Sequence, residues 1–593
     1  MATHSDVFLQ FALAFPEPLV QPHAWLLAKR LQEGHICISL DTDPQLASGS
    51  PAGAYPTTQQ LAERPLWIGN AGATTPFILH RNRLYLHRYF QYESAILGHI
   101  HRLLNAEIAS RSDKIDALLQ HLNLISSLEA DYPLQNLPPE LCADWSLAAV
   151  IMACLQHFTI LTGGPGTGKT TTVAKILWLQ YTLQPNCRIA LAAPTGKAAT
   201  RMADSLQSTT LPLPDAIRNK LQQLQPVTLH RLLGAKQDDI YFQHNENNPL
   251  PYDLVIVDEC SMIDVALFAK LLSAIGSSTR ILLLGDKNQL ASVEAGSLFG
   301  DLCSQTAAIN TFSSDTQNFI NRFIATPGRS LPISANNTPH PLAEHIIELQ
   351  YSHRFSSLSG IGRLSDAILH NRTTILDEFL LNNNGGEVSI TSPDSDSDLN
   401  TFIDGYEAYI REPDIYQALQ LFQQQRILCA MREGKGGLAE CNQLAESRLK
   451  KNNCLQPDTP FYENRPIIIT RNNKELELVN GDVGIVRTIQ GTKKLWLDAG
   501  NGQVRGISVQ YIQHAETVFA MTIHKSQGSE YNRVLIRMPN HPDIPILTRE
   551  LLYTAVTRAK QQAIIVSSEV VLKATAAGSV QRASGITHRM DEL

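Results

Sequence analysis

The stretch TILTGGPGTGKTTTV, residues 159–173, combines a short apolar run, a glycine-rich turn and a lysine followed by threonines. Residues 163–170 satisfy the pattern G-x-x-x-x-G-K-[ST], whose glycines let backbone N–H groups converge on a phosphate. Val173, Ile176 and Leu177 then recur at helical spacing. The sequence therefore predicts a strand, a phosphate-binding loop and a helix, in that order.

This loop predicts a site for a nucleoside triphosphate. We expect Lys169 to reach the terminal phosphates and Thr170 to supply a hydroxyl to Mg²⁺. The helix N-terminus adds a partial positive charge toward the same phosphates. The loop residues predicted to bind the nucleotide are Gly163, Gly164, Pro165, Gly166, Thr167, Gly168, Lys169, Thr170 and Thr171.

An acidic pair follows an apolar run in DLVIVDE, residues 253–259. The run would form a strand that carries Asp258 and Glu259 to the carboxyl edge of a sheet. We expect Asp258 to hold Mg²⁺ and Glu259 to polarise the attacking water, because phosphoryl transfer uses both functions.

Apolar runs of this kind recur along the chain, separated by segments of helix length. Such runs are typical of strands buried on both faces of a parallel sheet. We therefore predict an α/β protein with two parallel-sheet domains. The first group of runs is 158–162, 188–194, 253–259 and 280–286, and the second is 425–431, 533–539 and 561–568.

Composition limits the classes of protein to which this chain can belong. It has 593 residues, 43% hydrophobic and 18% charged, with a formal net charge of −7, which fits a multidomain globular protein. The nine cysteines include no CxxC pair, which argues against a zinc site or a disulfide framework. Without a basic leader or a run of about eighteen apolar residues, we expect a cytoplasmic protein with no membrane span.

Changes in residue composition and motif content along the chain suggest domain limits. Residues 1–130 carry no chemical motif and are expected to form a mainly helical domain that docks a partner. Residues 131–345 would hold the first parallel-sheet domain. Residues 346–460 and 513–593 would hold the second and end in a mobile tail. Between these two parts, 461–512 has β-type runs with tight-turn signals, which predict a small β-barrel-like insert.

Further blocks follow the phosphate loop in a definite order. Together with GGPGTGKTTTVAK they resemble the motif set of superfamily 1 helicases, and among these they most resemble the RecD family. The resemblance extends over essentially the whole chain and implies two RecA-like motor domains with an SH3-like insert at 461–512. The blocks are LAAPTGKAATRM (191–202), TLHRLLG (228–234), GDKNQLASVEAG (285–296), YSHRF (351–355), AMTIHKSQGSEY (520–531) and LLYTAVTRAK (551–560).

The resemblance implies a catalytic set, and the chemistry of the side chains agrees with it. Gln289 follows a strand end, where it would sense the terminal phosphate. Arg354 and Arg558, both expected in the second motor domain, would reach across a cleft to the triphosphate. An arginine in such a position accelerates hydrolysis by about 10³–10⁵. With Lys169 and Glu259, these residues complete the predicted catalytic set.

The resemblance also implies a groove for single-stranded DNA. Hydroxyl, amide and backbone N–H groups bind phosphates without reading base sequence, as a translocating motor requires. Glu530 would orient the nucleotide ribose. Many helicases of the superfamily have an adenine-binding glutamine where this chain has Ser146, so Trp145 or another group would recognise adenine. The predicted DNA-binding residues are Pro194, Thr195, Lys197, Thr228, His230, His524, Ser526 and Gln527.

By resemblance, we expect an ATP- and Mg²⁺-dependent 5′→3′ DNA helicase and single-strand DNA translocase. It would join RecB-like and RecC-like subunits in a heterotrimer that processes double-strand breaks, with the nuclease centre on a partner and the N-terminal region on the RecC-like subunit. Two alternatives remain. One is a free-standing RecD-like helicase, although no helix-hairpin-helix repeats are evident before residue 140. The other is a regulatory NTP-dependent switch that moves no strand.

Overall fold

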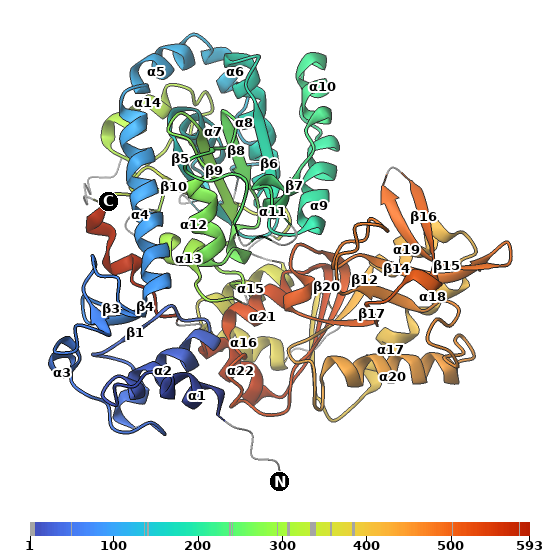
Figure 1. Ribbon diagram of the computed structural model, residues 1–593. Helices are drawn as coiled ribbons and strands as arrows, with labels where there is room; N and C mark the ends of the chain where they lie inside the picture. The colour runs from blue at the N-terminus through green and yellow to red at the C-terminus, as the bar shows by residue number, and fades with distance from the viewer. Residues whose placement is uncertain are drawn as a thin grey trace.

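The computed structural model describes residues 6–593 except 49, 136, 139–140, 237–238, 240, 293, 305–308, 333–339, 356–358, 382–385, 501 and 580–581. Two parallel sheets, an antiparallel sheet and a small N-terminal sheet make up its strands. In Figure 1 the first parallel sheet lies above the second. The prediction of an α/β protein with two parallel-sheet domains is confirmed.

The first sheet is parallel throughout and is buried on both faces. Helices α7 (Trp145–Leu155) and α8 (Lys169–Leu183) contribute to the core on one face, and α12 (Val265–Ser273) contributes to the core on the other. All four runs predicted between 158 and 286 form strands here. The spatial order is β10 (Ile346–Leu349), β5 (Phe158–Gly163), β9 (Arg280–Gly285), β8 (Leu254–Val257), β6 (Ile189–Ala193) and β7 (Val227–Thr228).

The second sheet is also parallel and contains the three runs predicted between 425 and 568. Its order is β11 (Val388–Thr391), β20 (Ala559–Val566), β19 (Tyr531–Arg537), β12 (Gln425–Cys429) and β18 (Ala520–Thr522). The helices of this part are α15 (Gly360–Leu369), α16 (Thr373–Leu381), α17 (Ser397–Asp404), α18 (Glu407–Arg411), α19 (Ile415–Gln423), α20 (Leu438–Lys451), α21 (Arg549–Val556) and α22 (Glu569–Ala577).

The predicted insert forms a five-stranded antiparallel sheet with its own small core. Its last strand pairs with its first, so the sheet extends beyond the predicted limit of residue 512 and closes with residues 515–517. The order is β16 (Gln503–Ser508), β15 (Thr492–Gly500), β14 (Val483–Ile489), β13 (Pro466–Ile469) and β17 (Ala515–Thr517).

The N-terminal region, which was expected to be mainly helical, combines helices with a four-stranded sheet. The helices are α1 (Val7–Leu13), α2 (Gln21–Gln32), α3 (Thr58–Ala62), α4 (His87–Ile108), α5 (Arg111–Leu119) and α6 (Leu122–Ser126). The sheet order is β1 (Cys37–Ser39), β4 (Arg83–Leu86), β3 (Phe77–His80) and β2 (Ile68–Gly69). No helix in the described ranges is long and apolar enough to cross a membrane.

Two predicted domain limits were wrong because packing crosses them. Strand β10 pairs with β5, so residues 346–349 belong to the first sheet rather than to the second domain. Leu118, Ile125 and Leu128 are buried in the core of the first parallel-sheet domain, so the N-terminal region does not end as a separate unit at residue 130.

The C-terminal segment is packed, not mobile as the sequence suggested. After α22 it returns to the N-terminal region, where Gly585 N–H donates to Glu93 Oε1 at 2.7 Å. Ile586 is fully buried against the first motor domain's core, and Arg589 donates to Ser94 at 2.9 Å. In Figure 1 the segment lies beside α4 and the chain ends there. The tail therefore ties the second domain back to the N-terminal half.

Further helices complete the first parallel-sheet domain. They include α9 (Gly196–Gln207), α10 (Asp215–Gln223), α11 (Leu229–Leu232), α13 (Leu298–Cys303) and α14 (Ser314–Asn321). Helix α9 follows the carboxyl end of β6 and lies beside the first sheet in Figure 1.

Candidate active site

The glycine-rich loop follows the carboxyl end of β5 and caps α8. Gly166 and Gly168 adopt φ values of +79° and +87°, a left-handed conformation that glycine tolerates best. Lys169 Nζ donates to the backbone carbonyls of Gly163 at 2.6 Å and Gly164 at 3.1 Å. The lysine is therefore held over the loop at the start of the helix, where phosphate groups are favoured.

The acidic pair lies at the end of β8, beside the loop. Glu259 N–H donates to Asp258 Oδ1 at 2.8 Å, and Glu259 has a left-handed φ of +53°, which is unusual for a residue with a side chain. Burial, and then repulsion from Glu259, raise the pKa of Asp258 to about 6, while Lys169 lowers it. Strain and a perturbed pKa at one strand end are typical of functional sites.

Glu530 anchors a cluster of cations in the cleft. It accepts a 2.8 Å hydrogen bond from Arg354 and forms an ion pair with Arg201 of α9. Lys560 Nζ lies 3.5 Å from Glu530 Oε2. Burial alone would raise the pKa of Glu530, but the attraction of Arg201 and Arg354 outweighs it and lowers the pKa to about 2. The carboxylate is thus ionised and joins groups from both motor sheets.

Arg354 was expected in the second domain, and this assignment was wrong. The segment 351–355 leaves β10 of the first sheet and contacts the phosphate loop, where His353 N–H donates to Gly166 O at 2.8 Å. Arg354 Nη1 is buried and has no hydrogen-bond partner among the described residues. This donor therefore faces the cleft with its capacity unused, as an anion site requires.

Arg558 comes from the second sheet and is 2% exposed. Its Nε donates to Thr554 O at 3.1 Å and its Nη1 to Ser529 O at 3.2 Å. Burial lowers the pKa of Arg558 from its ordinary value, and repulsion from Arg201 acts in the same direction. Among the described residues, Arg558 has no carboxylate within 4 Å, whereas Arg201 and Arg354 both pair with Glu530. The positive charge of Arg558 is therefore available to a bound anion.

Gln289 lies at the junction of the two sheets. Its Nε2 donates to Asp286 Oδ2 at 3.1 Å, and the hydroxyl of Tyr553, on α21 of the second domain, donates to the same oxygen at 3.1 Å. Gln289 Oε1 is buried without a partner in the part of the chain that the structure describes. The amide is thus fixed at one end and available at the other.

The next residue continues this junction. Leu290 N–H donates to Thr554 Oγ1 at 2.9 Å, and Leu290 O accepts from Gln527 Nε2 at 2.6 Å. Both partners belong to the second domain. The segment that carries Gln289 is therefore held by groups that would shift whenever the two domains move.

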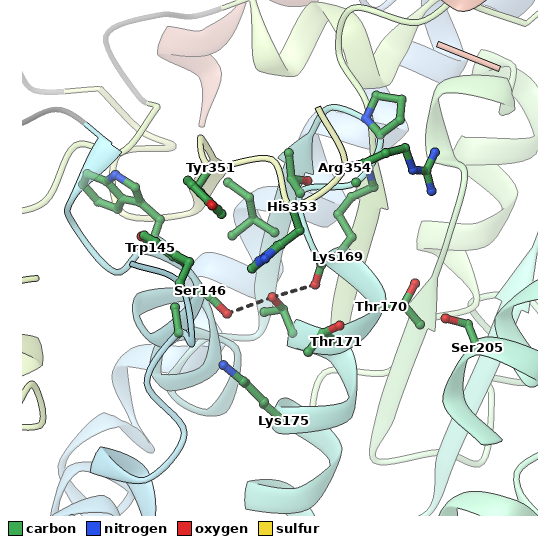
Figure 2. Close-up of a pocket in the computed structure, with 18 of the residues that line it drawn as sticks. Trp145, Ser146, Lys169, Thr170, Thr171, Lys175, Ser205, Tyr351, His353 and Arg354 are labelled. Atoms are coloured by element: carbon green, nitrogen blue, oxygen red, sulfur yellow. Dashed lines mark hydrogen bonds between the residues drawn. The ribbon is translucent and has the colours of Figure 1, made fainter. Parts of the chain in front are cut away.

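These groups enclose one cavity of about 870 Å³ between the two sheets. In Figure 2, Lys169, Thr170 and Arg354 lie toward the right of the view, Trp145 and Tyr351 lie toward the left, and His353 lies between the two groups. Cations and a hydroxyl on one side with aromatic rings on the other fit a nucleoside triphosphate. The unpartnered donor of Arg354 supports this fit, and Thr170 with Asp258 offers the hard oxygen ligands that Mg²⁺ prefers.

Ser146, which stands in place of the usual glutamine, has its hydroxyl 2.9 Å from Thr172 Oγ1. Trp145 Nε1 donates to Gln350 Oε1 at 3.2 Å, and the Trp145 ring stacks on Phe312. Both side chains are thus already engaged with protein groups, while Gln350 lines the cavity beside Tyr351.

The predicted DNA-binding residues lie at or just after the carboxyl ends of β6, β7 and β18, but not all present free side chains. Thr195 and Thr228 cap α9 and α11 through their hydroxyls. Ser526 is fully buried and donates to Ile523 O, and Gln527 contacts Leu290 as described. Pro194, Lys197 and His524 are partly exposed, and His230 is exposed.

Sequence reasoning missed three residues of the site. Arg201, Asp286 and Tyr553 all lie inside blocks that the sequence singled out, yet no role was predicted for them. Asp286 is 2% exposed and burial raises its pKa, while its partner Tyr553 comes from the other domain. Only the folded arrangement reveals such pairs, because their members are far apart in the chain.

Comparison with known proteins agrees with this arrangement. A family model described as an AAA domain matches residues 146–295, and one described as a UvrD-like helicase C-terminal domain matches residues 517–566. The chain is 36% identical over 454 residues to the RecBCD enzyme subunit RecD of Mycobacterium tuberculosis, which covers 74% of this chain and 72% of that one.

Two other relatives give a useful contrast. The RecBCD enzyme subunit RecD of Haemophilus influenzae is 33% identical over 482 residues, covering 76% of this chain and 73% of that one. The ATP-dependent RecD2 DNA helicase of Deinococcus radiodurans is 28% identical over 416 residues, which cover 69% of this chain but 46% of that protein.

Proposed function

Because the chain belongs to the RecD family of superfamily 1 DNA helicases, we propose that it hydrolyses ATP with Mg²⁺ to move 5′→3′ along single-stranded DNA. The observation that carries this proposal is the single cavity shared by the two parallel sheets. Its phosphate loop and acidic pair come from the first sheet, while Arg558 and Glu530 come from the second. Hydrolysis at such a junction opens and closes the cleft, which is how a two-domain motor steps.

The residues of the cleft divide the work of phosphoryl transfer. Lys169 binds the terminal phosphates, and Glu259 orients and polarises the attacking water. Thr170 and Asp258 hold Mg²⁺, which neutralises charge on the phosphates when bound. Arg354 and Arg558 stabilise the charge that develops in the transition state.

Gln289 couples the nucleotide to the DNA groove. Its neighbour Leu290 is bonded to Gln527, which adjoins the predicted DNA-binding residues His524 and Ser526. A change at the terminal phosphate would therefore be felt in the loop that borders the DNA. The groove is lined by the remaining predicted residues, Pro194, Thr195, Lys197, Thr228 and His230.

The family suggests the assembly in which the motor works. We propose a heterotrimer with RecB-like and RecC-like subunits that unwinds DNA at double-strand breaks, with the nuclease centre on a partner chain. The N-terminal region would contact the RecC-like subunit. The antiparallel sheet at 466–517 would act as an SH3-like accessory domain, and Glu530 would also contact the ribose.

The decisive experiment measures ATP hydrolysis by the full chain with and without single-stranded DNA. Strong stimulation by DNA, lost in Lys169→Gln and retained in the exposed control Lys451→Gln, is the expected result. Tailed duplexes would then give the polarity. Hydrolysis indifferent to DNA, both alone and with RecB-like and RecC-like partners, would instead support a regulatory switch.

The same assays separate the subunit from a free-standing helicase. The matched region spans most of the RecD subunits but less than half of the RecD2 protein. We therefore expect unwinding of long duplexes to require the partner subunits. Efficient unwinding by the chain alone would favour a RecD2-like role.

A further inference from the structure

A second cavity of about 1000 Å³ lies at the opposite edge of the first sheet from the ATP site. His157 precedes β5 and Arg280 opens β9, so the amino ends of these strands form its floor. Lys114 of α5 lines another wall. The carboxyl ends of the same strands carry the catalytic groups, so this cavity is separate from the motor site.

The positive groups of this cavity lack acidic partners. Lys114 Nζ donates to Leu155 O at 2.9 Å, and Arg280 Nη1 donates to Cys154 O at 3.2 Å. Two carboxylates, Asp113 and Asp253, also line the cavity. Among the described residues, however, neither cation has a carboxylate within 4 Å, and Asp253 pairs with Arg188 at 2.9 Å instead. Arg280 is only 7% exposed, so its charge is also poorly solvated. Buried charges without partners are costly unless a ligand neutralises them.

His157 adds an unused polar group to the same space. It is 7% exposed, and its Nδ1 is buried without a partner among the described residues, while Nε2 lies 3.5 Å from Ser110 Oγ. Burial, and then repulsion from Lys114 and Arg280, lower the pKa of His157 to about 4, despite an opposing effect of the Ser277 backbone. These three side chains therefore face one another closely enough to repel.

The same repulsion acts on the lysine. Burial is the main cause that lowers the pKa of Lys114 to about 8, and repulsion from the nearby Arg280 acts in the same direction. Glu107 opposes this shift, but its carboxylate already accepts from the backbone N–H of His157 at 3.1 Å and lies near His345. A bound anion would relieve the repulsion that the protein alone leaves in place.

We infer that this cavity binds a small phosphate-bearing anion, held by Arg280 and Lys114 with hydroxyls from Ser110 and Ser277. A guanidinium and an ammonium together match a doubly charged oxyanion, and arginine suits phosphate because its donors form a planar fork. The volume is that of a small-molecule site. Such a ligand would join α5 to the sheet of the first motor domain, on the side away from hydrolysis.

The test uses inorganic pyrophosphate as the probe and lysine acetylation as the readout. The full chain is treated with an amine-reactive acetylating reagent at pH 7.5, with and without pyrophosphate at matched ionic strength, and modification is measured peptide by peptide. We expect pyrophosphate to slow acetylation of Lys114 about tenfold, because a bound anion both shields the amine and restores its protonation. Acetylation of Lys169 in the same digest reports binding at the phosphate loop separately.

Arg280→Met is the diagnostic variant, and Arg218→Met on α10 is its charge-matched control outside the cavity. Arg280→Met should raise the pyrophosphate concentration for half-protection of Lys114 about tenfold or more, because a charged hydrogen bond is lost. The control should behave as the unaltered chain. If Arg280→Met does not fold, thermal unfolding of Lys114→Met in pyrophosphate provides a second measurement. This variant should lose the part of the stabilisation that comes from anion binding in the second cavity.

Two results would overturn the inference. One is acetylation of Lys114 that pyrophosphate leaves unchanged, or slows equally in both arginine variants. The other is protection by a short single-stranded oligonucleotide but not by pyrophosphate, which would make the cavity part of a nucleic-acid path.

Discussion

Nη2 of Arg354 donates a 2.8 Å hydrogen bond to Glu530 Oε2, although 176 positions separate the two residues. Glu530 precedes β19 of the second sheet, whereas Arg354 follows β10 of the first. The contact therefore links the two motor domains at the mouth of the cavity. It uses one end of the guanidinium and leaves Nη1 without a partner in the described chain. In the proposed function, Glu530 positions the arginine and the other donor serves the phosphates.

Removing Arg354 should slow catalysis far more than it weakens binding. Arg354→Ala is expected to lower kcat for DNA-stimulated ATP hydrolysis by about 10³, because the guanidinium stabilises charge that develops only in the transition state. Steady-state kinetics with saturating single-stranded DNA would measure the change. Arg363→Ala is the control, since Arg363 lies outside the cavity, where it pairs with Glu378 and lies over the ring of Phe379.

A rise in KM with an unchanged kcat would contradict this assignment, because it would place Arg354 in ground-state binding alone. The same kinetics with Arg354→Lys would test the geometry. Lysine keeps the charge but not the planar fork, so we expect most of the loss to remain.

Tyr553→Phe should uncouple the two domains without destroying the nucleotide site. The substitution removes the hydroxyl that donates to Asp286 across the junction. Because a hydrogen bond to a charged group contributes about 1.5–3 kcal/mol, stimulation of hydrolysis by DNA should fall roughly tenfold. The ratio of hydrolysis rates with and without DNA measures this. Tyr511→Phe, at an exposed tyrosine, should leave the ratio unchanged.

Local signals were sufficient to predict the strands and the phosphate loop. The runs at 158–163 and 254–257 are buried along their whole length, and they are mostly apolar because both faces of the sheet are covered. Domain limits were harder to predict, because β10 joins the first sheet through a pairing with β5 that no local pattern encodes. Likewise, neither the mixed N-terminal sheet nor the docking of the C-terminal segment follows from periodicity.

In the candidate site, too, some features follow from local sequence and others do not. Lys169 and Asp258 line the same cavity, as expected of residues that each follow a strand of one parallel sheet. The partners of Glu530 could not be predicted, since Arg201 and Lys560 reach it from different domains. Side-chain pairing across a cleft depends on how two sheets are placed, and the sequence of either sheet does not specify that placement.

Gly166→Ala should strongly weaken nucleotide binding while leaving the fold intact. A Cβ at this position would lie 2.3 Å from Arg354 Cβ, and the φ of +79° is unfavourable for alanine. We expect affinity for ATP to fall about a hundredfold, as measured by equilibrium binding of a fluorescent analogue. Gly72→Ala is the control, because an added Cβ there meets nothing within 4 Å. Normal binding by Gly166→Ala would show that the loop and segment 351–355 separate easily.

The docking of the C-terminal segment should depend on pH through Asp301 of α13. Burial raises the pKa of Asp301 to about 7, and repulsion from Glu93 adds to the shift, while Ser584 and Arg582 of the segment oppose it. The folded pKa lies above the ordinary value of 3.8. The folded state therefore binds the proton more tightly than the unfolded state does. The resulting stabilisation is complete below about pH 4 and is lost as the pH rises through about 7.

Asp301→Asn should remove this dependence, because an amide cannot ionise. We expect its thermal midpoint to exceed that of the unaltered chain by a few degrees at pH 8, and the difference to narrow as the pH is lowered to 5. The exposed substitution Asp458→Asn should follow the unaltered chain at both values. Proteolysis between α22 and residue 593 at pH 8 gives a local measure, and cleavage should be slower in Asp301→Asn. An equal pH dependence in all three proteins would show that Asp301 stays ionised in the folded chain, held by Arg582.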